Sequence, residues 1–311
     1  TPNLKWETNL NFNVGVDFSL FNNRFSGSFD FFTRRSKDLL YSRPIAPSLG
    51  YGSIDENVGA LKNTGIEMVL NGTIINQNGW VWKLGMNLTH YKNKVTDLPL
   101  KDMPQSGVNK LQVGRSVYDF YMIEWAGVDP ENGDPLWYMD EEDENHNPTG
   151  KRVTTNDYGS ADYYYVNKSS LPKVYGIGGY IYNRDVTMIL HNGSLEGRDW
   201  STEILRRWTP DNRYTDVPAL STTSNNWNSA STRFLQNNSY MRLKNLTLSY
   251  NLPKQWISKL SLSSVQVYVQ GDNLFTIHRN QGLDPEQGIT GITYYRYPAM
   301  RTISGGINVS F

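Results

Sequence analysis

Strict alternation of apolar and polar residues marks the first segment of the chain. Every even position from Leu4 to Leu20 is apolar or threonine, and every odd position is polar or glycine. A period of two is typical of a β-strand with one apolar and one polar face. The segment is about three times as long as a usual globular strand. Because a tilted strand crosses a bilayer in about 9–11 residues, the pattern predicts a strand that spans a membrane and projects beyond it.

The alternation recurs along the chain. A return strand is predicted over about 24–41. An Asn-Gly turn, which is a strong hairpin signal, joins the alternating segment 66–74 to another that begins at Trp80. Two more alternating segments lie at 265–270 and 302–311. We therefore expect about ten antiparallel strands in residues 1–311.

The connections between these strands are unequal in length. Turns such as the one at 76–79 are short, whereas four connections are long and polar. Short turns at one end and long extracellular loops at the other are typical of outer-membrane barrels, and compact soluble domains rarely carry several long loops. We therefore predict an all-β, antiparallel transmembrane barrel over 1–311. Its expected extracellular loops are about 42–64, 94–115, 140–170 and 190–238.

Composition narrows the possible functions. The chain has 30 basic and 30 acidic residues, no Cys and a mean hydropathy of −0.56. Zero net charge gives no reason to expect nucleic acid as a partner. The absence of Cys excludes disulfides and thiolate metal sites, and we expect no cofactor. The N-terminus lacks a signal sequence, so we expect this chain to be part of a longer one.

Charged residues on the polar strand faces are candidates for the wall of a lumen. A Lys or Arg on the lipid face at mid-bilayer costs roughly 2–4 kcal/mol, so such residues are expected to face the lumen or lie beyond the bilayer. Hydration of the wall is the simpler role, and ligand contact is the alternative. The candidate residues are Glu67, Lys83, Arg242 and Lys244.

Aromatic residues in the long loops are candidates for contact with a partner or a ligand. Tyr163, Tyr164, Tyr165 and Trp227 lie in such loops. Aromatic rings stack on sugars and anchor protein interfaces, although packing within their own loop is equally expected.

The acidic turn Asp129–Asp134 is a weak candidate for a calcium site. It lacks the spacing of an EF-hand, so a plain Asn-Gly turn is the simpler interpretation. No catalytic constellation is found, because Ser194 does not stand at the centre of a nucleophile elbow. The protein is therefore not expected to be an enzyme.

The end of the chain carries a candidate assembly signal. Phe311 follows Val309 and Ile307 at two-residue steps. This ending resembles the C-terminal signal by which the barrel-assembly machinery recognises outer-membrane barrels, although any last strand can end in Phe.

Eight stretches together resemble the SusC/RagA group of TonB-dependent transporters from Bacteroidota. Their order and spacing cover nearly the whole chain. They are 57–67 (NVGALKNTGIE), 127–137 (GVDPENGDPLW), 171–176 (LPKVYG), 207–210 (RWTP), 240–250 (YMRLKNLTLSY), 270–276 (QGDNLFT), 282–286 (GLDPE) and 298–302 (PAMRT).

The resemblance implies that the chain is the C-terminal portion of a plugged barrel of roughly 22 strands, with the plug, the TonB-contacting segment and the first strands outside these residues. It also implies a SusD-like surface lipoprotein as a lid, energy from the TonB complex, and import of oligosaccharides or sometimes peptides. A dimer of transporter–lid pairs is a further option. In relatives a strand pair usually follows the LPKVYG stretch, so we expect residues to be missing near Gly176–Gly178.

Two other functions remain open from the sequence. The first is a passive or structural outer-membrane barrel, which an upstream plug would exclude. The second is a secreted, soluble β-rich binding or adhesion protein. In that case the apolar faces would be buried under a second sheet.

Overall fold

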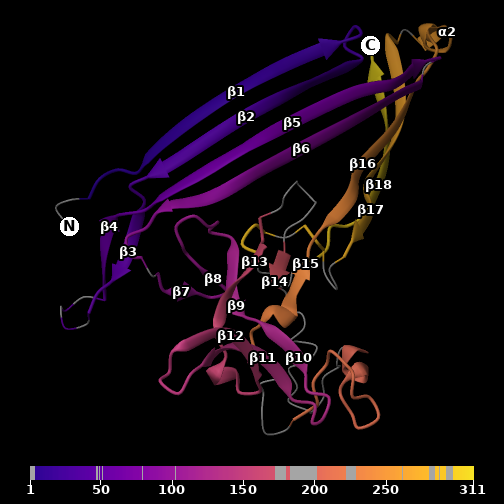
Figure 1. Cartoon of the computed structure of the whole chain (residues 1–311). Helices are drawn as coiled ribbons and strands as arrows, with labels where there is room; N and C mark the ends of the chain where they lie inside the picture. Colours follow the sequence, from indigo (N-terminus) through magenta and orange to yellow (C-terminus); the bar gives the residue numbers. More distant parts are fainter. Residues whose placement is uncertain are drawn as a thin grey trace.

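Long antiparallel strands dominate the chain. The computed structural model describes residues 4–46, 48, 50, 52–78, 80–101, 103–171, 180–182, 202–221, 229–260, 262–279, 284–286, 288–291 and 297–311. Seven strands form one sheet in the order β1-β2-β5-β6-β16-β17-β18 (Figure 1). They are β1 (Thr8–Leu20), β2 (Phe25–Lys37), β5 (Ala60–Gln77), β6 (Trp80–Asp97), β16 (Tyr240–Asn251), β17 (Ser264–His278) and β18 (Thr302–Ser310).

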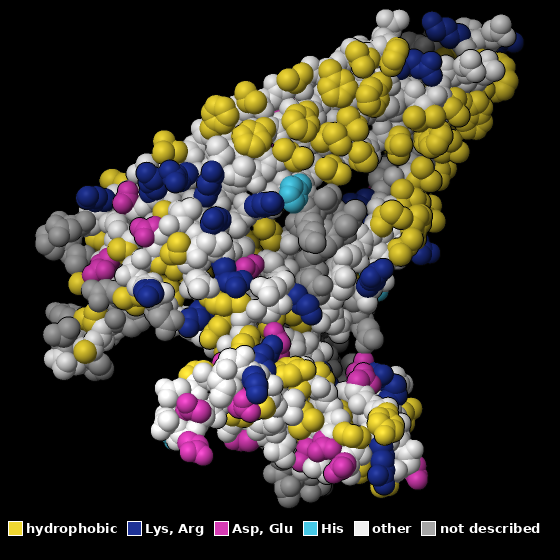
Figure 2. Space-filling view, viewed as in Figure 1, with side chains coloured by type: hydrophobic (Ala, Val, Ile, Leu, Met, Phe, Trp, Pro, Cys, Tyr) yellow, Lys and Arg dark blue, Asp and Glu magenta, His cyan; other side chains and the backbone are white. Residues whose placement is uncertain are grey.

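The strand register brings the apolar faces of the first four strands together. Val16 pairs with Phe29 on β2, Phe29 pairs with Met68 on β5, and Met68 pairs with Leu88 on β6. Rows above and below repeat this arrangement, because alternating residues point to the same face of a sheet. The result is a continuous apolar band across four strands, visible in yellow in Figure 2.

The apolar band is open to the surroundings. Phe12 is 57% exposed, Val14 is 59% exposed, Trp82 is 38% exposed and Val309 is 43% exposed. A soluble sandwich would bury these four side chains against a second sheet. Contiguous apolar surfaces of this extent mark an interface with a membrane or a protein. Because no second sheet of the described residues buries these side chains, the arrangement contradicts a soluble sandwich. Among the described residues, no helix has the length and apolar character needed to cross a membrane.

The sheet has two distinct ends. At one end the strands are joined by the short turn 21–24, by the turn that begins at Asn78 and by the one-turn helix α2 (Lys254–Ile257). The strands β6 and β16 meet near this end through only two residue pairs, Val81–Ser249 and Trp80–Tyr250. From there the two halves of the sheet diverge (Figure 1).

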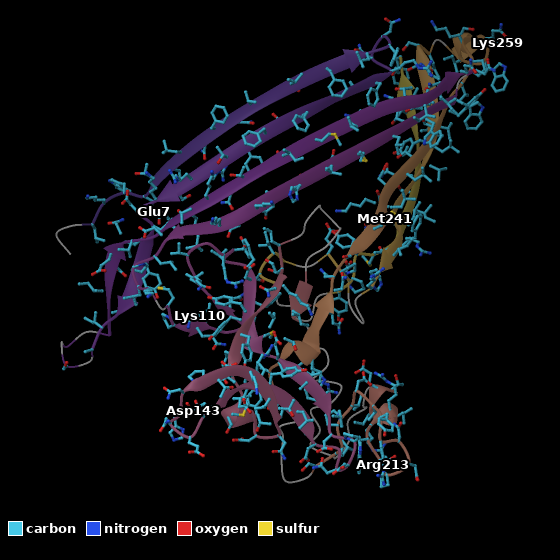
Figure 3. The ribbon with its side chains drawn as sticks, in the orientation of Figure 1. Glu7, Lys110, Asp143, Arg213, Met241 and Lys259 are labelled. Carbon is cyan, nitrogen blue, oxygen red and sulfur yellow. The ribbon has the colours of Figure 1, made fainter. Side chains whose placement is uncertain are left out.

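The other end of the sheet carries the long connections, which contain strands of their own. The first of them holds the hairpin β3–β4, and the residues after β6 form two small sheets. The short strands are β3 (Leu40–Pro44), β4 (Ser53–Asn57), β7 (Gln105–Ser106), β8 (Asn109–Lys110), β9 (Asp119–Ile123), β10 (Trp125–Val128), β11 (Pro135–Glu142), β12 (Pro148–Thr155), β13 (Tyr163–Ser169), β14 (Tyr180–Tyr182) and β15 (Leu235–Asn237). We call residues 105–171 the loop subdomain, which lies below the long strands in Figure 3 around the labelled Lys110 and Asp143.

The buried hydrophobic clusters of the described chain lie in the loop region and not in the long sheet. One cluster joins Phe120 and Met122 of β9 to Phe234, and a second joins Ile123 to Trp137. Trp137 packs edge-on against Tyr158 at 5.1 Å between ring centroids. The loop subdomain is therefore a packed body, whereas the long sheet presents its apolar side chains outward.

A charge placed on the apolar band should destabilise the barrel, whereas the same charge on the polar face should not. Val16→Arg lies at the middle of the band and is expected to cost roughly 2–4 kcal/mol at the bilayer midplane. Asn13→Arg, on the opposite face of the same strand, is the matched control, with an expected cost below about 1 kcal/mol. Urea titration of the full-length protein in lipid vesicles measures both. Equal effects of the two variants would contradict a lipid-facing band.

Candidate functional site

The loop subdomain is attached to the end of β6 through Asn93. The Asn93 side-chain oxygen accepts hydrogen bonds from the Val117 backbone N–H at 2.9 Å and from the Ser116 hydroxyl at 3.2 Å. Its side-chain nitrogen donates to the Asn63 side-chain oxygen at 2.8 Å. Two backbone hydrogen bonds join Val95 to Gly114 and Arg115. We call these contacts of Asn93 and Val95 with residues 114–117 the joint. The joint therefore fixes the loop subdomain to two wall strands at once.

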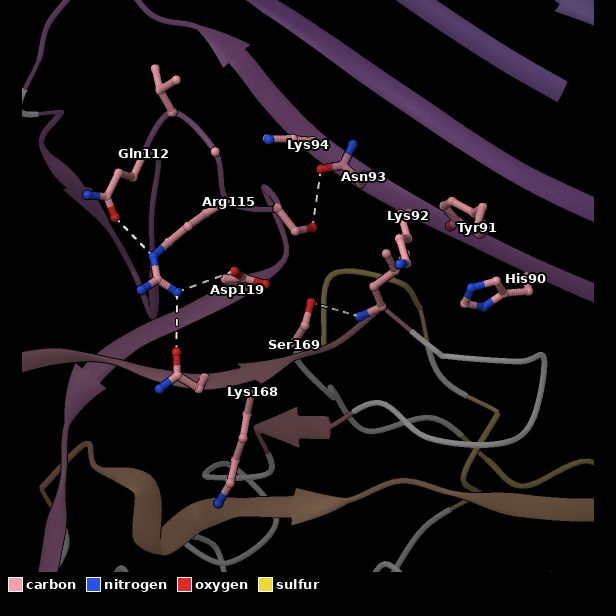
Figure 4. A pocket seen from close by; sticks show the side chains of 15 residues that line it. His90, Tyr91, Lys92, Asn93, Lys94, Gln112, Arg115, Asp119, Lys168 and Ser169 are labelled. Atoms are coloured by element: carbon pink, nitrogen blue, oxygen red, sulfur yellow. Dashed lines mark hydrogen bonds and ion pairs between the residues drawn. The ribbon is translucent and has the colours of Figure 1, made fainter.

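A cavity of about 910 Å³ opens beside this joint, between β6 and the strands β9 and β13 (Figure 4). The Arg115 and Lys168 side chains lie there with a single carboxylate, Asp119, while Lys92 and Lys94 border the cavity from β6, on the strand face opposite to Asn93. Such a lining favours groups with negative charge or strong hydrogen-bond acceptors. The cavity is therefore the candidate ligand site that the described residues offer.

Arg115 is held in a fixed position within the cavity. Its side chain donates to Gln112 Oε1 at 3.0 Å and lies 3.8 Å from the Asp119 carboxylate. The guanidinium also stacks over the Tyr165 ring at 4.1 Å from the centroid. An Arg held by three neighbours loses little rotamer freedom when it binds an anion.

The three tyrosines of β13 have different environments. The Tyr164 hydroxyl donates to Asp140 Oδ1 at 2.9 Å, and Arg152 covers its ring at 3.9 Å. Burial, together with the hydrogen bond to Asp140, raises the pKa of Tyr164 to about 12. Tyr165 is half-buried and donates to the Lys110 carbonyl at 3.2 Å. Tyr164 and Tyr165 thus take part in packing within the loop subdomain.

Tyr163 is the most exposed of the three. Its ring stacks on Tyr121 with 5.7 Å between the centroids and remains 41% exposed. Lys110 lies 5.0 Å from the Tyr121 ring centroid, so this face combines flat aromatic surface with a cation. Trp227 lies outside the described residues, as does the Gly176–Gly178 segment.

Arg242 and Lys244 converge on one acidic segment. Arg242 donates to Thr276 at 2.9 Å and forms ion pairs with Asp284 and with Glu286, the latter at 3.1 Å. Lys244 reaches the other oxygen of Glu286 at 2.6 Å. The Arg242 and Asp284 side chains are only 5% and 8% exposed. These contacts join three of the stretches that carry the family resemblance.

The pKa of Asp284 reflects this setting. Burial by itself raises the pKa, but backbone N–H donors from Ala299 and Glu286 and the Arg242 guanidinium hold it below its ordinary value. The carboxylate is therefore charged at neutral pH and completes a buried ion pair. Sequence reasoning singled out Arg242 but missed Asp284, which lies 42 residues away; the GLDPE stretch was the available signal.

Glu67 and Lys83 lie on strand faces opposite the apolar band. Glu67 follows Ile66 on β5 and pairs with Asp30 and Thr89 on the neighbouring strands. Lys83 precedes Leu84 on β6 and pairs with Thr73. Both residues lie on the polar face, as the alternation of apolar and polar residues in the sequence predicts. Their role in lining a lumen stays a prediction.

The Asp129–Asp134 segment forms a closed turn. The Asp129 carboxylate accepts from the Glu131 N–H at 2.8 Å, and Gly133 takes a φ of +81°. A Cβ on Gly133 would lie 2.6 Å from the Trp208 ring, whose indole N–H donates to the Pro130 carbonyl at 3.2 Å. Within the described chain, no three His, Asp or Glu side chains are grouped for metal binding.

The final strand leaves its terminal aromatic residue exposed. Ile307 and Val309 alternate outward on β18, and Phe311 is 94% exposed. Its availability is compatible with the predicted assembly signal, which stays a prediction.

The fold defines a wall segment of an outer-membrane β-barrel. A family model described as "TonB dependent receptor-like, beta-barrel" matches residues 1–274. The chain belongs to this family of TonB-dependent receptor barrels, whose members reside in the bacterial outer membrane, and its SusC/RagA-like character is confirmed by the relatives below.

Three relatives illustrate the likeness. TonB-dependent receptor P3 of Formosa agariphila is 30% identical over 353 residues, covering 99% of this chain and 34% of the relative. TonB-dependent receptor SusC of Bacteroides thetaiotaomicron is 27% identical over 337 residues, covering 99% and 32%. The solved structure of the RagAB peptide transporter matches with a TM-score of 0.80 and 31% identity, covering 100% and 36%. The chain thus spans about one third of the length of these relatives.

Removal of the Asn93 side chain should loosen the loop subdomain. Asn93→Ala leaves the Val117 N–H without its partner, at a cost of about 1–3 kcal/mol for a group shielded from water. Hydrogen exchange at 114–117 in the full-length protein should accelerate, while exchange in β5 should stay unchanged. Asn87→Ala, at an exposed position of the same strand, is the control. Unchanged exchange at 114–117 would show that Asn93 does not hold the joint.

Arg242 and Lys244 should differ in their contribution to stability. Arg242→Gln leaves Asp284 charged and buried without its guanidinium, and breaking such a pair costs roughly 3–5 kcal/mol. Lys244→Gln removes a half-exposed ion pair, which is worth at most about 1 kcal/mol. The urea midpoint of the full-length protein in detergent should fall far more for Arg242→Gln. A similar, small change for both variants would contradict the buried ion pair.

Proposed function

We propose that this chain forms wall strands and extracellular loops of a TonB-dependent importer of nutrient oligomers. The observation that carries the proposal is the seven-stranded sheet, with an exposed apolar band on one face and polar residues on the other. Family membership supports energy coupling to the TonB complex through a plug. The relatives are receptors and transporters, which supports a protein without catalytic activity.

The long connections are assigned to the extracellular side in this proposal. Outer-membrane barrels have short periplasmic turns and long external loops, and the sheet shows that asymmetry between its two ends. The loop subdomain would then sit at the barrel mouth, fixed to β5 and β6 through Asn93.

A SusD-like surface lipoprotein is the proposed partner at this mouth. The stacked rings of Tyr121 and Tyr163 lie beside Lys110 and offer a rigid aromatic surface. Rigid aromatic residues are favoured anchors at protein interfaces. The likeness to SusC and to RagAB supports a partner of this kind.

Oligosaccharides are the proposed substrate class, with peptides as the alternative. Exposed aromatic rings such as that of Tyr163 suit sugars, whereas the similar RagAB is a peptide transporter. The cavity beside Arg115 favours substrates that carry carboxylate or other anionic groups. A passive barrel is the second candidate function, and a plug upstream of this chain separates the two.

Co-purification tests the proposal. The full-length protein, isolated in detergent from its native membrane, is expected to carry a surface lipoprotein, and mass spectrometry should identify bound oligosaccharide or peptide. Tyr163→Ala should reduce lipoprotein recovery several-fold, whereas Tyr214→Ala, at a distant and exposed position, should not. Uptake of the identified oligomer should stop when the membrane potential is collapsed. Uptake that continues without the potential would instead identify a passive channel.

A further inference from the structure

Five cations lie together on the same sheet face as the apolar band, at its loop end. Arg35 on β2 pairs with Lys62 on β5, and Lys62 pairs with Lys94 on β6. Lys92 lies on the same face one row closer to the middle of the band, in the row of Phe12, and Lys37 lies one row farther from the middle. We call Arg35, Lys37, Lys62, Lys92 and Lys94 the basic belt. Figure 2 shows Lys and Arg side chains gathered at this end of the yellow band.

The register places the basic belt at one edge of the hydrocarbon layer. On β1 the apolar band runs from Leu20, beside the short turn, to Leu10, which pairs with Arg35 on β2. Ten residues of strand rise about 33 Å, which at the tilt of barrel strands corresponds to about 25 Å of height, the usual thickness of a barrel's apolar band. The side chains of the belt therefore reach the level of lipid headgroups.

Juxtaposed cations of this kind attract an anion. Neighbouring strands are about 4.8 Å apart, and like charges directly opposite on a sheet destabilise it. Among the described residues, no side chain forms a hydrogen bond or ion pair with Arg35, Lys62 or Lys94. Two carboxylates, Asp38 and Asp97, lie with Arg35 and Lys37 around a hollow of about 380 Å³. They leave the belt with an excess of positive charge.

We propose that the basic belt binds the phosphate groups of lipid headgroups in the outer leaflet. Basic residues beside a membrane surface attract anionic lipid, and Arg and Lys bind phosphate through charge-assisted hydrogen bonds. The belt is continuous with the surface that contacts the acyl chains, so one lipid can touch both. Substrate would pass on the opposite face of the same strands.

This inference rests on the proposed extracellular orientation but not on the proposed substrate or lid. The test uses the full-length protein in detergent, with native mass spectrometry after addition of phosphorylated lipid A or its dephosphorylated form. The test variant combines Arg35→Gln, Lys37→Gln and Lys62→Gln, because Lys92 and Lys94 also border the cavity beside Arg115. The control combines Lys101→Gln, Lys151→Gln and Arg213→Gln, which remove equal charge elsewhere on the surface.

The unaltered protein and the control should retain phosphorylated lipid A at least about tenfold more strongly than the belt variant. A charge-preserving variant with Arg35→Lys, Lys37→Arg and Lys62→Arg should retain the lipid, which separates charge from misfolding. Equal retention of both lipid forms would overturn the proposal, as would unchanged binding by the belt variant. Loss of a protein dimer or of the lipoprotein from the belt variant, with lipid retention unchanged, would also overturn it and identify a protein contact. Because uptake is not the readout, failure here leaves the importer function untouched.

Discussion

Hydrocarbon provides no hydrogen-bond partner for the peptide backbone, and this constraint governs the whole molecule. Each wall strand must pair along its length while its side chains divide between lipid and a polar interior. The register from β1 to β6 meets both demands, since it places Val16, Phe29, Met68 and Leu88 in one row. Because a slip by one residue would move every apolar side chain to the wrong face, the alternation itself specifies the pairing.

The same constraint explains why the packed core lies in the connections and not in the long sheet. The wall offers its apolar side chains to lipid, so the buried clusters around Phe120 and Trp137 form in the connections instead. Several stretches that carry the family resemblance serve as joints in this region. Trp208 covers Gly133, and Arg242 is paired with Asp284. In this chain these stretches therefore have a structural role, because they join the loops to the wall.

The features of the fold that could be predicted from the sequence are those that depend on residues close together in the chain. Alternation between Leu4 and Leu20 and the turn at Asn78 were sufficient for the long hairpins, and the exposed apolar face confirmed the barrel. The strands within the expected loops escaped prediction, because two to eight residues are too few to establish a period. Asn93 and Asp284 escaped for a different reason: their partners lie about 24 and 42 residues away, and a single sequence does not report long-range contacts.

The joint between β6 and the loop subdomain has a mechanical consequence. Val95 exchanges backbone bonds with Gly114 and Arg115, while Asn93 bonds to Val117 beside them. Bonds arranged side by side share a load, so a force along the strand must stretch several of them together. A displacement of the loop subdomain would therefore be transmitted to the barrel wall as shear, not absorbed by a hinge.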